Sequence, residues 1–348
     1  MNLKKLYIER AVYPAMNLLQ HSRVTEYTKA LQQTEQLDPL QRAAALRQKV
    51  SDLLFLCRTQ VPVYAGLPFS DLDLRREPMD CLQAVEPVMI SDFLASTEEY
   101  IRRDADLTHL HHRRCGGENG ARIYLTQEQI ERYEAARWRG LSWYGVTYGS
   151  PSVLLWDKPR SPFVLQEEPY MKNRLSLSVC AMTDRSVQPT AEEIDQFQPE
   201  YITGSASSLE TMAEAMLRTG VRLQQPLKVV TVTKGIANGE LRRKLSEAFQ
   251  CPVAQVLSGR IEGLVGYMCP EGHLHITAEH CLVEILDPRT WAPLPPGQRG
   301  LVAVTNLLDE TMPHLRVILE YMGELDPEPC PCGRTLPVLK HLQKTAPA

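Results

Sequence analysis

The 348 residues carry a formal net charge of −4 and are 43% hydrophobic, and no run approaches the roughly 18 uncharged apolar residues of a membrane-spanning helix. The basic residues are dispersed, which argues against nucleic acid or a membrane surface as the partner. The first twenty residues place charges inside their apolar pattern, unlike a signal peptide. We therefore expect a cytoplasmic protein whose nine cysteines are reduced thiols or metal ligands.

Helices are predicted first along the chain. Apolar positions in residues 1–60 recur near a period of 3.6, which predicts an N-terminal helical layer. A further helix is expected over residues 126–146, because Thr126 is a good N-cap and Gln129 completes a capping box. The run PSVLLW that follows predicts a buried strand.

Predicted strands then alternate with predicted helices. The strands are LSLSV, YITG, LKVVTVT and PVAQVL, and the helices between them are TAEEIDQF, SLETMAEAMLRTG and GELRRKLSEAF. Such crossover connections are typical of a parallel sheet covered on both faces. From about Tyr267 onward, Pro/Gly turns join predicted strands. We therefore expect an α/β fold with a helical layer (1–60), a pocket-bearing core (61–266) and a β-rich subdomain (267–348).

The segment HHRRCGGENGARIYLT, residues 111–126, reads as a glycine-rich loop between an extended segment and a helix. Such loops bind phosphate because backbone N–H groups approach the anion without side-chain obstruction. This one lacks the usual Ser and Thr hydroxyls. Its candidate ligand-binding residues are Arg114, Gly116, Gly117 and Asn119.

Several motifs, in a shared order, resemble the phenylacetate–coenzyme A ligase branch of the adenylate-forming enzymes. They are FQPEYITGSASSLETMA, SGRIEG, MCPEGHLHI, RGLVAVTNL, MPHLR…GEL and CPCGRT. The resemblance covers residues 40–340 and implies the large-domain fold of that superfamily, with helix-covered, mostly parallel sheets and an acyl pocket. It implies ligand-binding roles for Gly204, Ser205, Ser258, Gly259, Glu262 and Glu324.

Departures from the family pattern affect the nucleotide site. Ser258 stands where the resemblance implies an adenine-stacking Tyr, and Glu324 stands where it implies a ribose-binding Asp. Around Thr233 the family's Gly-Glu signal has become TKGIANGE. The chain also ends at Ala348, about where the family continues into a mobile domain that carries a lysine used in adenylation. We therefore expect a degenerate nucleotide site and no mobile C-terminal domain.

Three functions are consistent with this pattern. The first is an acyltransferase that moves an acyl group from acyl–coenzyme A to the thiol of a carrier protein or another acceptor, without efficient adenylation. The second is an ATP-dependent acyl–coenzyme A ligase that uses Mg²⁺. The third is a non-catalytic homologue that positions a partner enzyme.

Cys115 is the candidate nucleophile of the acyltransferase hypothesis. His112 would act as its base, and the neighbouring Arg113 and Arg114 would lower the pKa of the thiol. Glu262 is the candidate acid/base or metal contact. The alternatives are that Cys115 is an incidental loop residue, that the basic cluster is a solvated edge and that Glu262 is structural.

A metal site is predicted near the C-terminus. Cys269 precedes a Pro-Glu-Gly turn, His275 lies on the following strand, and Cys330 and Cys332 flank a proline. Three thiolates and one imidazole suit the tetrahedral preference of structural zinc. His273 shares a strand face with His275 and is the rival fourth ligand. The alternative is a set of reduced, buried thiols.

Overall fold

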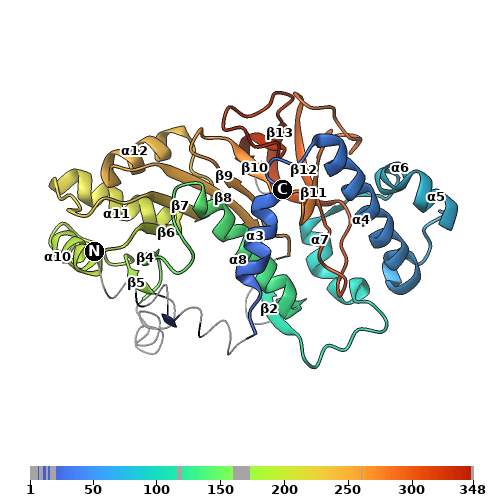
Figure 1. Ribbon diagram of the computed structural model, residues 1–348, viewed down its shortest axis with the longest axis horizontal. Coiled ribbons are helices and arrows are strands. Elements are labelled where there is room, and N and C mark those ends of the chain that lie inside the picture. The colour runs from blue at the N-terminus through green and yellow to red at the C-terminus, as the bar shows by residue number, and fades with distance from the viewer. Residues whose placement is uncertain are drawn as a thin grey trace. The chain divides into compact units, whose positions relative to one another are not determined.

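The computed structural model describes residues 21–115, 120–159, 173–259 and 261–345, together with four earlier residues, Tyr7, Ala11, Val12 and Ala15. The chain folds into two compact units (Figure 1). The first comprises Met1–Glu26, Arg137–Leu257 and Tyr267–Gly272, and the second comprises Tyr27–Ala136, Ser258–Gly266 and His273–Ala348. Each unit combines segments that are distant in the sequence, so its core depends on long-range contacts.

The first unit is built on a parallel sheet. Its strands are β4 (Ser152–Trp156), β5 (Arg174–Ser178), β6 (Tyr201–Ser205), β7 (Val229–Lys234) and β8 (Val253–Gly259). They lie in the order β8-β7-β6-β4-β5, and every neighbouring pair is parallel. The helices of this unit are α10 (Val187–Phe197), α11 (Ala206–Thr219) and α12 (Gly239–Phe249), whereas α8 (Gln127–Ser142) has residues in both units. The predicted α/β alternation is confirmed.

Helices α11 and α12 lie side by side, and α11 runs against β4, β6 and β7 (Figure 1). Their apolar faces share one core with the strands, for example Leu209 and Met212 with Ile202 and Val230. Gly220 ends α11 in the left-handed conformation, with φ 76°, as a residue without Cβ can at low cost.

The second unit is β-rich at its C-terminal end. Its strands are β1 (Val88–Met89), β2 (His111–Cys115), β3 (Ala121–Leu125), β9 (Gly263–Met268), β10 (Leu274–Ile276), β11 (Cys281–Leu286), β12 (Arg299–Asn306), β13 (Val317–Leu325) and β14 (Val338–Lys344). Strands β11-β12-β13-β14-β10 pair antiparallel in that order, and β1 pairs with β13 in parallel. The predicted strands joined by Pro/Gly turns are confirmed.

Helices of 3 to 22 residues lie in the N-terminal part of the chain. They are α3 (Val24–Gln33), α4 (Pro39–Gln60), η2 (Pro62–Tyr64), α5 (Asp71–Arg76), α6 (Pro78–Gln83), α7 (Ile90–Ala95) and η3 (Thr97–Tyr100). Figure 1 shows α4 beside α5 and α6. Residues 24–33 and 39–60 are helical, as predicted. Most of residues 1–20 lie outside the described part of the chain, and a separate N-terminal layer stays a prediction.

The segment 111–126 differs from its prediction. Strands β2 and β3 form an antiparallel hairpin in which His111 pairs with Leu125 and Cys115 pairs with Ala121. The glycine-rich stretch therefore connects two strands, and all of β3 separates it from the start of α8. A helix N-terminus binds anions only within its first turn, and the first turn of α8 follows β3 instead of the glycine-rich stretch.

The predicted capping box at Thr126 is confirmed. Gln129 N–H donates to Thr126 Oγ1 at 3.1 Å, and Thr126 N–H donates to Gln129 Oε1 at 2.7 Å. We expect Thr126→Ala to lower the free energy of unfolding by about 1 kcal/mol, because the N–H of Gln129 loses its acceptor, the Thr126 hydroxyl. Urea denaturation of both proteins measures this difference. Thr211→Ala, at an exposed position within α11, is the control, and equal losses in the two variants would contradict the capping role.

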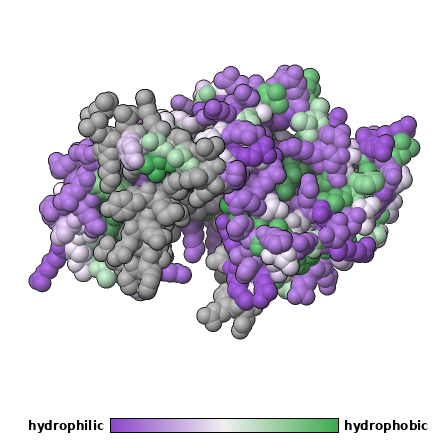
Figure 2. Space-filling view, turned by 60° about the horizontal axis from the view of Figure 1, so that its bottom comes forward, coloured by the Kyte–Doolittle hydropathy of each residue, from purple (hydrophilic) through white to green (hydrophobic). Residues whose placement is uncertain are grey.

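No helix among the described residues is both long and apolar enough to cross a membrane. Where Figure 2 colours the surface by hydropathy, hydrophobic residues lie among hydrophilic ones. Scattered apolar residues of this kind are ordinary on the surface of a folded protein.

Candidate functional site

Ser258 and Gly259 are the last residues of β8, and Glu262 lies in the turn that leads to β9. The side chain of Glu262 is 2% exposed, and its Oε1 has no hydrogen-bond partner among the described residues. A Cβ on Gly259 would overlap the Glu262 carboxylate, so this close approach requires glycine. The structure therefore brings Gly259 and Glu262 together, while Ser258 is exposed at the end of β8.

Burial raises the pKa of Glu262 from 4.5 to about 7, although backbone N–H groups of Glu262 and Ile261 act in the opposite direction. The carboxyl thus titrates near neutral pH. A buried carboxylate with an unused oxygen is stabilised in its charged form by a nearby cation. Such perturbed groups are common at functional sites.

Two residues that the sequence prediction missed hold this turn in place. Asn306 Nδ2 donates to the backbone oxygen of Ile261 at 3.2 Å and to Tyr133 Oη at 2.8 Å. The Tyr133 ring occupies the space that a Cβ on Gly263 would need, and Gly263 has φ 67°. Asn306 is the last residue of β12 and is fully buried, and its burial is known only from the structure.

Gly204 and Ser205 lie at the carboxyl end of β6 in the first unit. Strand β4 has β5 on one side and β6 on the other, so the strand order reverses there, and such switch points are the usual ligand crevices of α/β sheets. Ser205 Oγ accepts the N–H of Ser208 at 3.0 Å and so caps α11. A Cβ on Gly204 would lie 2.8 Å from the backbone oxygen of Leu155. Both residues have structural roles, and their ligand-binding roles stay predictions.

The hairpin does not pair Cys115 with His112. Side chains alternate between the two faces of a strand, so Cys115 shares a face with Arg113 and His111, whereas His112 and Arg114 lie on the other face. Cys115 is buried, and His111 Nε2 lies 3.0 Å from Gln127 Oε1. This alternation argues against direct proton transfer between His112 and Cys115 within β2. The predicted residues Gly116, Gly117 and Asn119 lie outside the described residues.

Glu324 lies in the middle of the second unit's sheet. On β13 it pairs in register with Arg299 of β12 and with Lys340 of β14. Lys340 also forms an ion pair with Asp326 at 2.5 Å. The register thus places Glu324 between two basic residues, and a ribose-binding role for it stays a prediction.

The predicted metal ligands do come together. The ligand atoms of Cys269, His275, Cys330 and Cys332 all lie within 4.8 Å of one another. The first three residues are buried, and Cys332 is partly exposed. His273, the rival ligand, has its Nδ1 3.0 Å from Cys330 Sγ.

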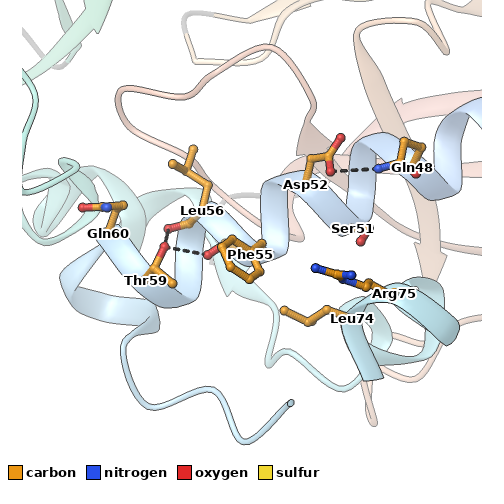
Figure 3. Close-up of a pocket in the computed structure, with 9 residues that line it drawn as sticks. All are labelled: Gln48, Ser51, Asp52, Phe55, Leu56, Thr59, Gln60, Leu74 and Arg75. Carbon is orange, nitrogen blue, oxygen red and sulfur yellow. Dashed lines mark hydrogen bonds between the residues drawn. The ribbon is translucent and has the colours of Figure 1, made fainter. Parts of the chain in front are cut away.

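Two grooves in the second unit adjoin α4. One has a cavity volume of about 780 Å³ between α4 and α5, and Figure 3 shows Phe55, Leu74 and Arg75 on its walls. The other has a volume of about 540 Å³ and includes Gln129 and Arg132 of α8. None of the predicted site residues that the structure describes lines either groove.

A comparison with known proteins finds a relative by sequence. The phenylacetate–coenzyme A ligase of Thermus thermophilus is 32% identical to this chain over 159 residues. Over this stretch the chain is homologous to that ligase. The matched stretch is 44% of this chain and 35% of the ligase, so it spans about a third of the ligase's length. No family model matches the chain.

Solved structures of 2-hydroxyisobutyryl-CoA ligase share the fold. The postadenylation state with 2-HIB-AMP superposes with a TM-score of 0.72 at 16% identity, over 90% of this chain and 69% of the ligase. An open conformation with 2-HIB-AMP and CoA gives a TM-score of 0.68 at 16% identity, over 88% of this chain and 75% of the ligase. The predicted fold and the resemblance to phenylacetate–coenzyme A ligase are confirmed.

Proposed function

We propose that the chain contributes to an ATP-dependent acid–coenzyme A ligase that forms an acyl-adenylate from a small carboxylic acid. The observation that carries this proposal is its homology to phenylacetate–coenzyme A ligase, supported by a fold shared with 2-hydroxyisobutyryl-CoA ligase. This replaces acyl transfer without adenylation as the first hypothesis, because the relatives support the ligase alternative better. The relatives lend no support to a carrier protein or a partner enzyme, so coenzyme A is the proposed acceptor thiol.

Glu262 is the residue best suited to the metal of such a reaction. Mg²⁺ is commonly held by one or two carboxylates together with substrate phosphates, and Glu262 offers a buried oxygen with no hydrogen-bond partner among the described residues. The ion would supply charge neutralisation at the phosphates of ATP. Gly259, without a side chain, leaves room for the Glu262 carboxylate in this position.

Zinc is the metal proposed for the cysteine cluster. Three thiols and one imidazole within 4.8 Å match the ligand types of closed, structural zinc sites. A closed site keeps no position for substrate, so this ion would stabilise the fold and take no part in acyl chemistry. A cytoplasmic location is also proposed, since all nine cysteines are free of disulfides and thiols stay reduced in that compartment.

The ligase proposal is tested by product formation. The protein is incubated with ATP, Mg²⁺, coenzyme A and a panel of aryl and aliphatic carboxylic acids, and acyl–coenzyme A is detected by mass spectrometry. We expect a thioester with at least one acid and none when ATP is omitted. Acyl exchange from an added acyl–coenzyme A to a second thiol without ATP, with no ATP-dependent product, would instead support the acyltransferase.

A further inference from the structure

The imidazole of the metal cluster already has the orientation that a metal requires. His275 Nδ1 lies 3.1 Å from the backbone oxygen of Leu336, which can only accept a hydrogen bond. Nδ1 therefore carries the hydrogen, and Nε2 presents its lone pair. Nε2 lies 3.2 Å from Cys332 Sγ. A carbonyl behind a histidine ligand is a common outer-shell arrangement at metal sites.

The four residues of the cluster lie on two turns and on β10. Cys269 begins a turn in which Gly272 N–H donates to Cys269 O at 2.9 Å, and His275 follows on β10, paired with Val338 of β14. Cys330 begins the second turn, in the connection between β13 and β14, where Gly333 N–H donates to Cys330 O at 3.1 Å. A metal at the cluster would therefore fix the position of this connection against β10.

The same connection contacts the N-terminal helices. Thr335 N–H donates to Glu35 O at 2.9 Å, and Thr335 Oγ1 donates to Leu37 O at 2.7 Å. Arg334 Nε donates to Glu35 Oε2 at 3.1 Å, with both side chains mostly buried. Arg42, in the first turns of α4, donates to Thr335 Oγ1 at 3.1 Å. These bonds link the cluster's second turn to the connection between α3 and α4.

We propose that zinc bound by Cys269, His275, Cys330 and Cys332 acts as a clamp that holds residues 34–38, between α3 and α4, against residues 330–335. This inference rests on the zinc occupancy proposed above. Only Gly333 separates Cys332 from Arg334, so a shift of the thiol moves both Arg334 and Thr335. Hydrogen bonds near 3 Å weaken steeply when donor and acceptor separate or misalign. Loss of the metal therefore loosens residues 34–38, just before α4, as well as residues 330–335.

The test measures zinc content and amide hydrogen exchange on the same full-length samples. Protein purified without added metal is expected to contain about one zinc per chain, and Cys332→Ser is expected to lose it. In Cys332→Ser, and in the native protein treated with a zinc chelator, amides of residues 34–38 should exchange at least about tenfold faster, which corresponds to about 1.4 kcal/mol. Amides of α12 should not change.

Two further variants separate the metal from the clamp. Cys251→Ser replaces a buried cysteine outside the cluster and should keep both the zinc and slow exchange at residues 34–38. Thr335→Val removes one donor to that segment and should speed its exchange with the zinc retained.

The outcomes distinguish the two proposals. Native protein that contains no zinc, and takes up none on incubation with it, would overturn the metal site and the clamp with it. Zinc that is removed without any change in exchange at residues 34–38 would overturn the clamp alone. The chelator experiment decides the question even if Cys332→Ser does not fold.

Discussion

Arg316→Met is expected to lower the free energy of unfolding by about 3–5 kcal/mol, because it leaves a buried carboxylate unpaired. Arg316 is 2% exposed, and its Nε donates to Glu284 Oε2 at 3.0 Å. Its Nη1 donates to the backbone oxygens of Gln83 and Val85 at 2.6 and 2.7 Å. Burial raises the pKa of Glu284 even beside this guanidinium, which acts in the opposite direction, so the charged carboxylate depends on Arg316 for its stabilisation. Urea denaturation at pH 7 measures the loss.

The matched control is an exposed ion pair of the same sheet. Lys344→Met breaks the pair between Lys344 and Glu320, whose side chains are 65% and 61% exposed, and should cost at most about 1 kcal/mol. Replacing Glu284 by Leu in the Arg316→Met background should restore part of the stability, because an apolar pair needs no charge compensation. If Arg316→Met lowers the free energy of unfolding no more than Lys344→Met does, the buried pair contributes no more to stability than the exposed pair.

Glu262→Gln is expected to reduce adenylation by about 10²–10³-fold, the effect of losing one charge-stabilising contact to a transition state. The same substitution should stabilise the fold at alkaline pH. The folded-state pKa of about 7 lies above the ordinary value of 4.5, so ionisation of Glu262 lowers stability as pH rises from about 4.5 to about 7. Above pH 7 the neutral Gln should therefore be more stable, by on the order of 3 kcal/mol, since each pKa unit corresponds to about 1.4 kcal/mol.

Pyrophosphate exchange measures the first effect, and urea denaturation at pH 4.5 and pH 8 measures the second. Glu320→Gln, an exposed carboxylate on β13, is the control and should change neither quantity. If Glu262→Gln leaves the rate of pyrophosphate exchange unchanged, Glu262 does not bind the metal of the proposed reaction. A stability difference that is the same at both pH values would contradict the raised pKa.

Local signals in the sequence were sufficient for much of the fold. The hydroxyl of Thr126 and the amide of Gln129 act on adjacent backbone groups, so the start of α8 could be predicted without tertiary contacts. Gly220 likewise ends α11 through its own backbone conformation. The spacing of Cys and His residues around Cys269 and Cys330 predicted a metal cluster, because thiolates and imidazoles are the ligands that structural zinc prefers.

Features that depend on pairing between segments were harder to predict. The run ARIYL is short and was included in a loop, and only its pairing with β2 makes it a strand. The interval between His112 and Cys115 looked favourable for a catalytic pair, but strand alternation separates their side chains. The contact of Asn306 with Tyr133 joins positions 173 residues apart, and no single-sequence pattern predicts such a contact.

The central claim is that this chain supports formation of an acyl-adenylate. ATP–pyrophosphate exchange tests it most directly, because this assay needs neither coenzyme A nor knowledge of the final acceptor. The protein is assayed with Mg²⁺ and a panel of aryl and aliphatic carboxylic acids, with Glu262→Gln in parallel. We predict that pyrophosphate exchange occurs with acids of one class, and that its rate falls by about 10²–10³-fold in Glu262→Gln. Absence of exchange with every acid, from protein whose urea denaturation shows a cooperative fold, would contradict the ligase proposal.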